Sequence, residues 1–237
     1  MNMPKAYVII PTYNEVENIE PLIERIQALH MPELYPVIVD DNSPDGTGEL
    51  ADKLALSLPQ LKVIHRLQDR GRGSAGIEGF KFALREGAEY IIEMDADLSH
   101  RPEYIPDMLE AIKGADLVLG SRFVPGGKDI DRGPLRRLTT FLARKYIQLM
   151  LGVKAKDVTS GFRCFRRKVL LWIDLDKMIS TGPSIVSEIL YKAHLKGFRA
   201  SEIPIIFDDR KKGETKLNLR ILLKTLIMVW RFRRCYK

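Results

Sequence analysis

The chain has 237 residues, 45% of them hydrophobic and 29% charged, as is ordinary for a soluble globular protein of one domain or two small ones. Its only cysteines, Cys164 and Cys235, have no paired spacing, which argues against a disulfide framework or a zinc site and fits a reducing cytosol. We expect neither a signal peptide, because the first apolar run is too short, nor a membrane-spanning helix, because no window offers roughly 20 apolar residues.

The net charge of +7 is unevenly distributed along the chain. Residues 1–121 contain 11 Lys/Arg against 21 Asp/Glu, whereas residues 122–168 contain 13 against 3 and residues 210–237 contain 10 against 1. In the last segment the basic residues alternate with aliphatic ones, which favours an anionic membrane surface and phosphate ligands over a nucleic-acid duplex. We therefore expect no nucleic-acid partner. The alternative, a nucleic-acid-binding module, predicts steeply salt-dependent binding to DNA.

The first 121 residues alternate between short apolar runs and segments with helical periodicity. This alternation predicts an α/β fold, with a mostly parallel sheet flanked by helices. The predicted strands are residues 6–11, 35–40, 61–65, 89–95 and 115–120, and the predicted helices are residues 16–29, 47–56, 74–86 and 102–113. After residue 120 the pattern changes, and it predicts helices at 135–151, 184–196 and 217–235 and strands at 162–165 and 200–207. We find no internal repeat and no linker.

Polar motifs follow the first two strands. The first strand ends in Pro11-Thr12-Tyr13-Asn14-Glu15, where Tyr13 offers a ring that stacks on a base. The second ends in Val39-Asp40-Asp41-Asn42-Ser43-Pro44-Asp45-Gly46-Thr47. Because ligands bind at the carboxyl ends of parallel strands, these acceptors predict a pocket for the N–H groups of a nucleobase and the hydroxyls of a ribose. Turn chemistry and helix capping are the alternative explanation, and they account for Pro44, Asp45 and Gly46.

The most informative motif is Met94-Asp95-Ala96-Asp97-Leu98-Ser99-His100, at the end of an apolar run. Two carboxylates one residue apart form a costly like-charge pair, which a divalent cation relieves. Mg²⁺ takes oxygen ligands and is commonly held by one or two carboxylates together with substrate phosphates. The motif therefore predicts a metal site for a diphosphate. An Asp-rich turn that caps the next helix is the alternative.

Three further segments contribute possible phosphate contacts. Gly71-Arg72-Gly73-Ser74-Ala75-Gly76 precedes a predicted helix, but its spacing is neither that of a dinucleotide fingerprint nor that of a P-loop, so close packing beside a nucleotide is the preferred interpretation. Gly120-Ser121-Arg122 closes another strand. Arg210 and Lys216 flank a glycine-containing segment, which suits a loop that closes over a diphosphate, although a solvated basic loop is equally compatible.

Taken together, these motifs resemble glycosyltransferase family 2, with its GT-A nucleotide-sugar-binding fold, and most closely its dolichol-phosphate (polyprenol-monophosphate) mannose synthases. The resemblance also rests on Gly-Ser-Arg-Phe at 120–123, Thr-Ser-Gly-Phe-Arg at 159–163 and Asp-Arg through Lys-Leu at 209–217, and it covers nearly the whole chain. Each motif alone is weak to moderate, whereas their order and spacing are highly specific. One departure from the family pattern is Arg72, which stands where the family often has Leu.

The resemblance implies a role for each matched residue. The nucleoside pocket would be lined by Pro11, Tyr13, Glu15, Val39 and Asp41. The ribose, diphosphate and metal, Mg²⁺ or Mn²⁺, would be met by Asp95, Ala96 and Asp97, with Asp95, Asp97 and Ser99 on the metal side. Phosphates would be held by Arg122, Arg210 and Lys216, which with Asp95 and Asp97 form the expected catalytic set.

The implied reaction moves mannose, with inversion, from GDP-mannose to a dolichyl or polyprenyl phosphate. A second basic cluster must hold the acceptor phosphate, and Arg132, Arg136 and Arg137 are its candidates. Two alternatives stay open: transfer of glucose or a similar sugar from a UDP donor to the same lipid, and a non-catalytic subunit that binds nucleotide sugar. The intact carboxylates of Asp95 and Asp97 argue against the second.

The resemblance and the basic C-terminal pattern together predict the domain organisation. Residues 1–216 are expected to form the catalytic domain, and residues 217–237 an amphipathic helix on an anionic membrane surface. Trp230 suits the headgroup region, and Arg231, Arg233, Arg234 and Lys237 follow it. We therefore expect a peripheral protein on the cytoplasmic face of a membrane. A helix packed on the domain is the alternative.

Overall fold

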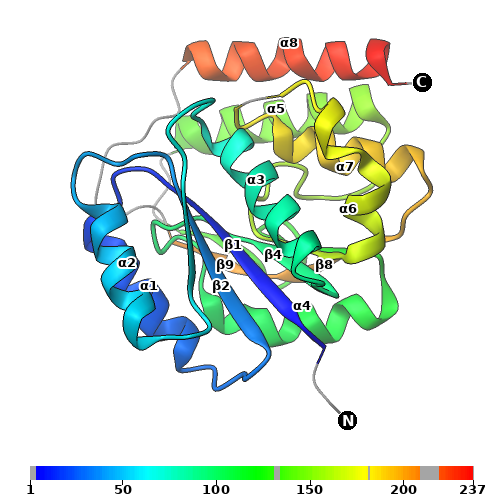
Figure 1. Cartoon of the computed structure of the whole chain (residues 1–237). Coiled ribbons are helices and arrows are strands. Elements are labelled where there is room, and N and C mark those ends of the chain that lie inside the picture. Colours follow the sequence, from blue (N-terminus) through cyan, green and yellow to red (C-terminus); the bar gives the residue numbers. More distant parts are fainter. Residues whose placement is uncertain (1–3, 131–133, 181, 209–218, 237) are drawn as a thin grey trace.

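A seven-stranded sheet with helices on both faces forms the centre of the chain in the computed structural model, which describes residues 4–130, 134–180, 182–208 and 219–236 (Figure 1). The strand order is β3-β2-β1-β4-β7-β5-β8. The bounds are β1 Ala6–Thr12, β2 Leu34–Asp40, β3 Lys62–His65, β4 Tyr90–Glu93, β5 Leu117–Ser121, β7 Arg163–Arg166 and β8 Ala200–Pro204. A separate two-stranded sheet pairs β6, Lys128–Asp129, with β9, Ile206–Phe207. This confirms the predicted α/β, mostly parallel architecture.

The helices lie close to the positions that periodicity predicted. Their bounds are α1 Val16–Gln27, α2 Thr47–Ser57, α3 Arg72–Arg85, α4 Ile105–Ala111, α5 Pro134–Leu151, α6 Arg167–Ile173, α7 Ile185–Leu195 and α8 Leu219–Cys235. Three 3₁₀ turns complete the set: η1 Pro102–Tyr104, η2 Ile112–Gly114 and η3 Leu175–Lys177. The predicted helix over 102–113 is therefore three pieces, η1, α4 and η2. The helix α6 had not been predicted.

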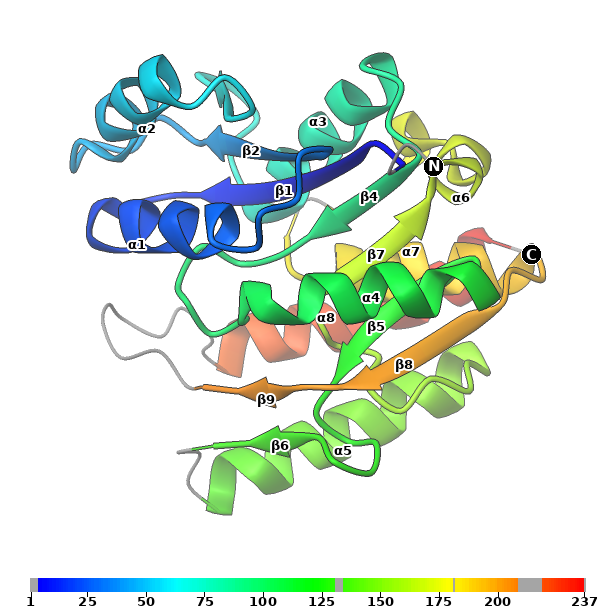
Figure 2. The ribbon, with the colours of Figure 1, turned by 90° about the horizontal axis from the view of Figure 1, so that it is seen from below.

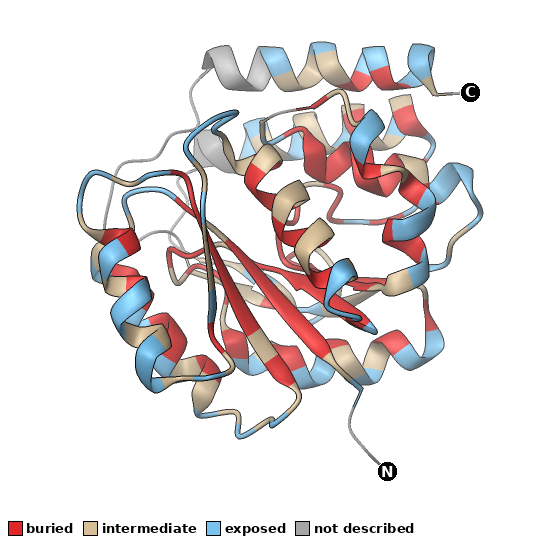
Figure 3. Cartoon of the chain, in the orientation of Figure 1, coloured by how far each residue is buried: buried red, intermediate tan, exposed pale blue. Residues whose placement is uncertain are grey.

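Alternating side chains of the strands supply two separate hydrophobic cores. Figure 2 shows helices on either side of the sheet, and Figure 3 shows that the central strands are largely buried. In β1, Tyr7 and Ile9 belong to the core beneath α3, α5, α6, α7 and α8. Ala6, Val8 and Ile10 belong to the core beneath α1, α2 and α4. This period of two is the consequence of strand geometry, and it explains why a central strand reads as a continuous apolar run.

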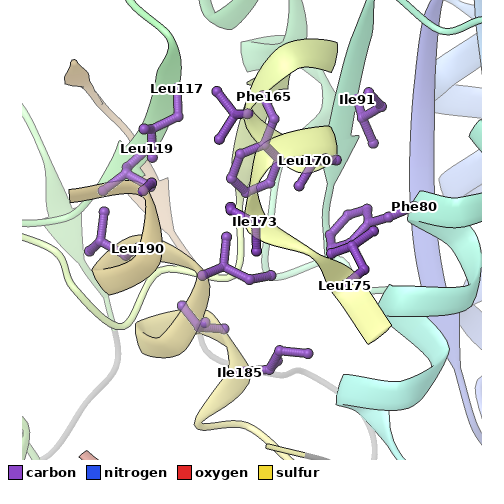
Figure 4. Packing of buried hydrophobic residues seen from close by; sticks show 14 of the residues in the cluster. Phe80, Ile91, Leu117, Leu119, Phe165, Leu170, Ile173, Leu175, Ile185 and Leu190 are labelled. Atoms are coloured by element: carbon purple, nitrogen blue, oxygen red, sulfur yellow. The ribbon is translucent and has the colours of Figure 1, made fainter. Parts of the chain in front are cut away.

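The strand β7 runs antiparallel between β4 and β5 (Figure 2). Its first residue, Arg163, pairs in register with Glu93 at the end of β4 and with Leu119 of β5. Phe165 packs with Phe80 of α3 in the centre of the core, with ring centroids 5.8 Å apart (Figure 4). Because β7 is antiparallel, its amino end lies at the edge where the parallel strands have their carboxyl ends.

The predicted strand 200–207 divides at Ile205 into β8 and β9. Pro204, which has no N–H, ends the ladder with β5, and Ile205 then donates to the carbonyl of Ser121 (3.0 Å) and accepts from Lys128 (2.9 Å). The chain therefore changes partner at this residue and continues beside β6.

The C-terminal helix α8 packs against the domain, beside α5 and α7 (Figure 1). Val229 and Phe232 are fully buried there. The hydroxyl of Tyr236 donates to the carboxylate of Glu188, and its oxygen also lies 3.0 Å from the carbonyl oxygen of Lys177. Ile227 and Trp230 are exposed on the other side of α8. The helix thus has one side in the core and an outer side on which the membrane contact stays a prediction. None of the helices in the described ranges is long and apolar enough to cross a bilayer.

Candidate functional site

The polar motifs meet at one edge of the sheet, as their positions after the strands predicted. Thr12 and Asp40, the last residues of β1 and β2, are register partners, and β4 pairs with the other side of β1. The chain turns sharply after each of these strands through a residue with positive φ: Asn14 (58°), Asn42 (55°) and Leu98 (61°). Asn tolerates this conformation, whereas Leu rarely adopts it, so the turn at Leu98 is a strained one of the kind that clusters at functional sites.

On the β1–β2 side, the expected nucleoside pocket surrounds Asp41. Its buried carboxylate forms an ion pair with Arg66 and accepts a hydrogen bond from the backbone N–H of Gly71 at 2.6 Å. Arg70 donates to the carbonyl oxygens of Asp41 and Asn42, and its guanidinium lies 5.1 Å from the ring centroid of Tyr13. Tyr13 is 37% exposed, so part of its side chain is accessible at the surface beside Asp41.

The other expected nucleoside residues lie beside this group. Pro11 and Val39 are register partners in β1 and β2. Glu15 donates through its backbone N–H to Thr47 and accepts from Asn18 at 2.7 Å. The structure thus gathers all five expected residues at the ends of two adjacent strands, while their role in binding a nucleoside stays a prediction. Asp45 accepts from the N–H and the hydroxyl of Thr47, which is the helix-entry turn that was the alternative explanation for this residue.

Asp97 and Ser99 form a compact oxygen-rich unit beyond β4. The carboxylate oxygen Oδ1 of Asp97 accepts from the hydroxyl of Ser99 at 2.5 Å and from its N–H at 3.1 Å. Both residues are buried, and Ala96 beside them is 3% exposed. Ser99 follows Asp97 by two positions, and the turn at Leu98 between them brings the N–H and hydroxyl of Ser99 onto the Asp97 carboxylate.

Arg72 forms an ion pair with Asp95, a contact that the sequence did not predict. The Nε and Nη2 atoms of Arg72 converge on Oδ1 of Asp95 at 3.0 and 2.7 Å, and Nη1 donates to Glu93 at 3.2 Å. Burial opposes the charge of Arg72, but Asp95 and Glu93 outweigh it, so the pKa of the guanidinium is raised. Glu93 in turn forms a fully buried ion pair with Arg163. The order Asp95–Arg72–Glu93–Arg163 is therefore a chain of alternating charges.

Two consecutive residues join the two acidic motifs. Gly71 donates to Asp41, and Arg72 pairs with Asp95. Gly71 has a φ of 136°, which an L side chain rarely adopts, so the glycine is required for this turn. The glycine-rich segment therefore serves packing beside the acidic motifs, in agreement with the structural interpretation of its spacing.

His100 is a buried residue that contacts the backbone of Asp95. Its ring stacks on Phe162, with centroids 5.2 Å apart, and Nδ1 accepts from the backbone N–H of Asp95 at 3.0 Å. Burial lowers the pKa of His100, against the opposing charges of Asp95 and Asp97. A neutral ring whose Nδ1 is the acceptor fits this environment, so His100 supports the backbone at Asp95.

Arg122 lies at the end of β5 in a buried ion pair with Asp157. Its Nε and Nη2 atoms are each 2.8 Å from an oxygen of that carboxylate, and Nη2 also donates to Thr159. The expected contact of Arg122 with a phosphate is untested, and the structure adds a structural role that sequence reasoning missed. Arg210 and Lys216, with Arg132, lie outside the described residues, and the side chains of Arg136 and Arg137 are also outside them.

Asp95, Asp97 and Ser99 offer carboxylate and hydroxyl oxygens, the ligand type that hard cations prefer. Across the described ranges, no group of three or more His, Cys, Asp or Glu side chains converges on one point. Carboxylate and hydroxyl oxygens at Asp97 and Ser99 nevertheless suit Mg²⁺ or Mn²⁺ bound through one or two protein ligands, with the remainder coming from a substrate diphosphate and water. The residues therefore fit a metal that is shared with a ligand, and they do not fit a closed all-protein metal cage.

Comparison with known sequences gives the family of the chain. A sequence model of the family described as "Glycosyl transferase family 2" matches residues 7–172. An undecaprenyl-phosphate mannosyltransferase of Micrococcus luteus is 40% identical, over 96% of this chain and 93% of its own. A polyprenol monophosphomannose synthase of Mycolicibacterium smegmatis is 43% identical, over 90% of this chain and 81% of its own. A dolichol-phosphate mannosyltransferase of Pyrococcus furiosus is 39% identical over 96% of this chain, which spans 63% of that protein.

Solved structures share the fold at low sequence identity. Glucosyl-3-phosphoglycerate synthase of Mycobacterium tuberculosis, in complex with Mn²⁺, UDP and glucosyl-3-phosphoglycerate, is 18% identical with a TM-score of 0.69, over 97% of this chain and 78% of its own. Mannosyl-3-phosphoglycerate synthase of Rubrobacter xylanophilus gives a TM-score of 0.68 at 18% identity, over 97% and 73%. Since the family match spans most of the chain and three relatives are at least 39% identical over nearly all of it, the chain belongs to glycosyl transferase family 2.

Proposed function

We propose that this protein is an inverting glycosyltransferase that moves mannose from GDP-mannose to a dolichyl or other polyprenyl phosphate. The three relatives above are named for mannose transfer to, or synthesis on, such a lipid phosphate, which supports the acceptor class and the sugar. The observation that carries the proposal is the joining of Asp41 and Asp95 through Gly71 and Arg72, because it brings the residues proposed for the nucleoside next to those proposed for the diphosphate.

In the proposed complex the donor lies along this edge of the sheet. Its base stacks on Tyr13, and its N–H groups and hydroxyls meet acceptors of the Asp41 pocket. Asp97 and Ser99, with Asp95, would hold Mg²⁺ or Mn²⁺ together with the diphosphate. The ion, when bound, supplies charge stabilisation to the departing diphosphate.

Basic side chains complete the proposed stabilisation of the leaving group. Arg210 and Lys216 follow Asp208, whose carboxylate Arg101 holds beside Ser99. Arg122 is also proposed to contact the departing diphosphate, although two of its nitrogen atoms already donate hydrogen bonds to Asp157 and Thr159. Positive charge placed where the diphosphate departs lowers the barrier more than it strengthens substrate binding.

The acceptor needs little activation. A phosphate monoester has its second pKa near ~6, so it is already an anion at neutral pH and attacks without a strong general base. A one-step in-line displacement inverts the anomeric centre, and an α-linked donor then gives a β-linked product. Arg132, Arg136 and Arg137 are the proposed contacts of the acceptor phosphate. Because that phosphate is carried by a membrane lipid, we propose a peripheral position on the cytoplasmic face of the membrane.

A transfer assay tests the function directly. Purified protein is given polyprenyl phosphate, Mg²⁺ or Mn²⁺, and either radiolabelled GDP-mannose or UDP-glucose. We expect label in the lipid fraction from GDP-mannose only. Label from UDP-glucose alone would establish the alternative donor, and nucleotide binding without transfer from either donor would establish a non-catalytic subunit.

A further inference from the structure

Arg72 occupies an unusual place for a cation beside a proposed metal site. Its guanidinium lies between two carboxylates and donates twice to a single oxygen of Asp95. The side chain is only 24% exposed, and that of Asp95 is 30% exposed. A charge-assisted contact of this kind is roughly twice as strong as a neutral hydrogen bond. The like charge of Asp95 and Asp97 is therefore relieved by the chain itself before any cation binds.

The glycine of the Thr159–Arg163 motif provides the space for this guanidinium. A Cβ atom added to Gly161 would lie 2.6 Å from Nη2 of Arg72 and 3.4 Å from Oδ2 of Asp95. The first separation is shorter than real Cβ contacts, so a side chain at this position displaces the end of Arg72. The motif therefore has two structural roles. Gly161 leaves room for the guanidinium of Arg72, and Arg163 neutralises Glu93, the second carboxylate that Arg72 contacts.

We propose that Arg72 is a positioning residue that competes with a divalent cation for Asp95, so that the empty site binds metal weakly and gains affinity when a nucleoside diphosphate arrives. The inference rests on the proposed function. Arg72 neutralises and fixes Asp95, which leaves Asp97 and Ser99 as the oxygen donors that the cation meets first. The phosphates of the donor then contribute the ligands and the negative charge that the protein withholds. Metal and nucleotide consequently bind together.

In the test, Mn²⁺ is titrated into the protein and the free ion is measured by electron paramagnetic resonance. The titration is done without nucleotide and with GDP. Arg72→Leu removes the charge, Arg72→Lys keeps it, and Gly161→Ala displaces the guanidinium while every charge remains. Arg85→Leu is the matched control, because Arg85 lies on the same helix in an exposed pair with Glu78. Circular dichroism melts confirm that each variant is folded.

Without nucleotide, we expect Arg72→Leu to bind Mn²⁺ about tenfold more tightly than the unaltered protein, the factor that corresponds to one lost charge-assisted contact of about 1.4 kcal/mol. Gly161→Ala shifts the affinity in the same direction by less, and Arg72→Lys and Arg85→Leu stay near the unaltered value. With GDP the gain shrinks to about threefold or less, because the diphosphate supplies the ligands in both proteins.

A gain in metal affinity separates competition from damage, since a merely structural defect weakens metal binding. Unchanged or weaker Mn²⁺ binding by folded Arg72→Leu overturns the inference. If Arg72→Leu does not fold, an unchanged Mn²⁺ affinity of Gly161→Ala overturns it instead. If the unaltered protein with GDP takes up no more Mn²⁺ than GDP alone binds, the gain of affinity with nucleotide and the proposed metal site both fail, while the labelled-donor assay still tests the function separately.

Discussion

Arg101 and Asp208 form a two-pronged ion pair, with Nε 2.8 Å from Oδ2 and Nη2 3.1 Å from Oδ1. Arg101 directly follows the Asp97–His100 turn, and the backbone N–H of Asp208 donates to the carbonyl of Ser99 at 3.4 Å. The pair thus ties the segment that precedes Arg210 and Lys216 to the proposed metal side of the site.

We expect Arg101→Leu to lower kcat about tenfold, because a misplaced basic segment stabilises the departing diphosphate poorly. The free energy of unfolding should change by less than about 1 kcal/mol, as is usual for a partly exposed pair. Arg25→Leu is the control, since Arg25 and Glu103 form a nearby pair of the same geometry. Equal losses of kcat in both variants would refute the tie.

Asp97→Ala should reduce sugar transfer about a thousandfold while the fold survives, because it removes the carboxylate proposed to hold the cation that stabilises the departing diphosphate. Asp95→Asn should be nearly as damaging, since it breaks the pair with Arg72. Asp107→Ala on the exposed side of α4 serves as the control. Initial rates are measured in excess Mg²⁺ or Mn²⁺, and full activity of a folded Asp97→Ala protein would exclude the assigned role.

Arg210→Ala should lower turnover more than it weakens binding of GMP, because the monophosphate lacks the leaving group on which Arg210 is proposed to act. Kinetics with GDP-mannose and calorimetry with GMP give the two values. Equal losses would contradict the clamp. Proteolysis around residues 211–213 should also slow when donor and metal are present.

Asp157→Asn tests the acid stability that the Arg122 pair confers. Burial raises the pKa of Asp157, but the hydrogen bond and charge of Arg122 outweigh it, so the folded pKa lies below the ordinary 3.8. The stabilisation is therefore present above pH 3.8 and is lost as the pH falls through the folded value. We expect the variant to be about 3 kcal/mol less stable at pH 7 and to depend less on pH below 4. Urea unfolding at several pH values measures both, and an unchanged acid limb would contradict the assignment.

The outer side of α8 can be tested without disturbing its buried side. The double variant Ile227→Ser, Trp230→Ser should float less with anionic liposomes at low salt while its melting temperature stays nearly unchanged. Phe232→Ala should cost about 3–5 kcal/mol of stability, because this ring is fully buried. Since α8 contributes to the core, a chain ending at Lys216 exposes that core and is a poor test of lipid binding. Unchanged flotation of the double variant would point to the basic 132–145 region.

Sequence patterns predicted the strands and the edge at which their motifs meet, because both depend on local periodicity and on the rule that parallel strands place their carboxyl ends together. They did not predict the antiparallel insertion of β7, since the pairing of Glu93 with Arg163 joins residues 70 positions apart. The division at Ile205 was missed for the same reason: the partner of that strand changes, while its own apolar pattern continues.

The positions of the acidic residues at one edge of the sheet were predicted, whereas the arginines that pair with two of them were not. Asp41, Asp95 and Asp97 follow strands closely, whereas Arg66 and Arg72 reach Asp41 and Asp95 from other parts of the chain and leave no local signal. The one available clue was Arg72 in place of the usual Leu. The like charge at Asp95 and Asp97 had been taken to require a metal, but the structure shows that a guanidinium already relieves part of it.

The late position of β7 in the chain has a consequence for biosynthesis. As the ribosome releases the protein from its amino end, the strands β1 to β4 and the acidic motifs emerge first, and Arg163 follows about seventy residues behind Glu93. Until it arrives, the nascent chain has a carboxylate at the centre of its sheet without the buried partner found in the finished protein. Arg72, which precedes Glu93 in the chain, is available as a first partner, and Arg163 completes the charge balance as β7 enters the sheet. We therefore expect the donor edge to be complete only when the second half of the molecule has folded.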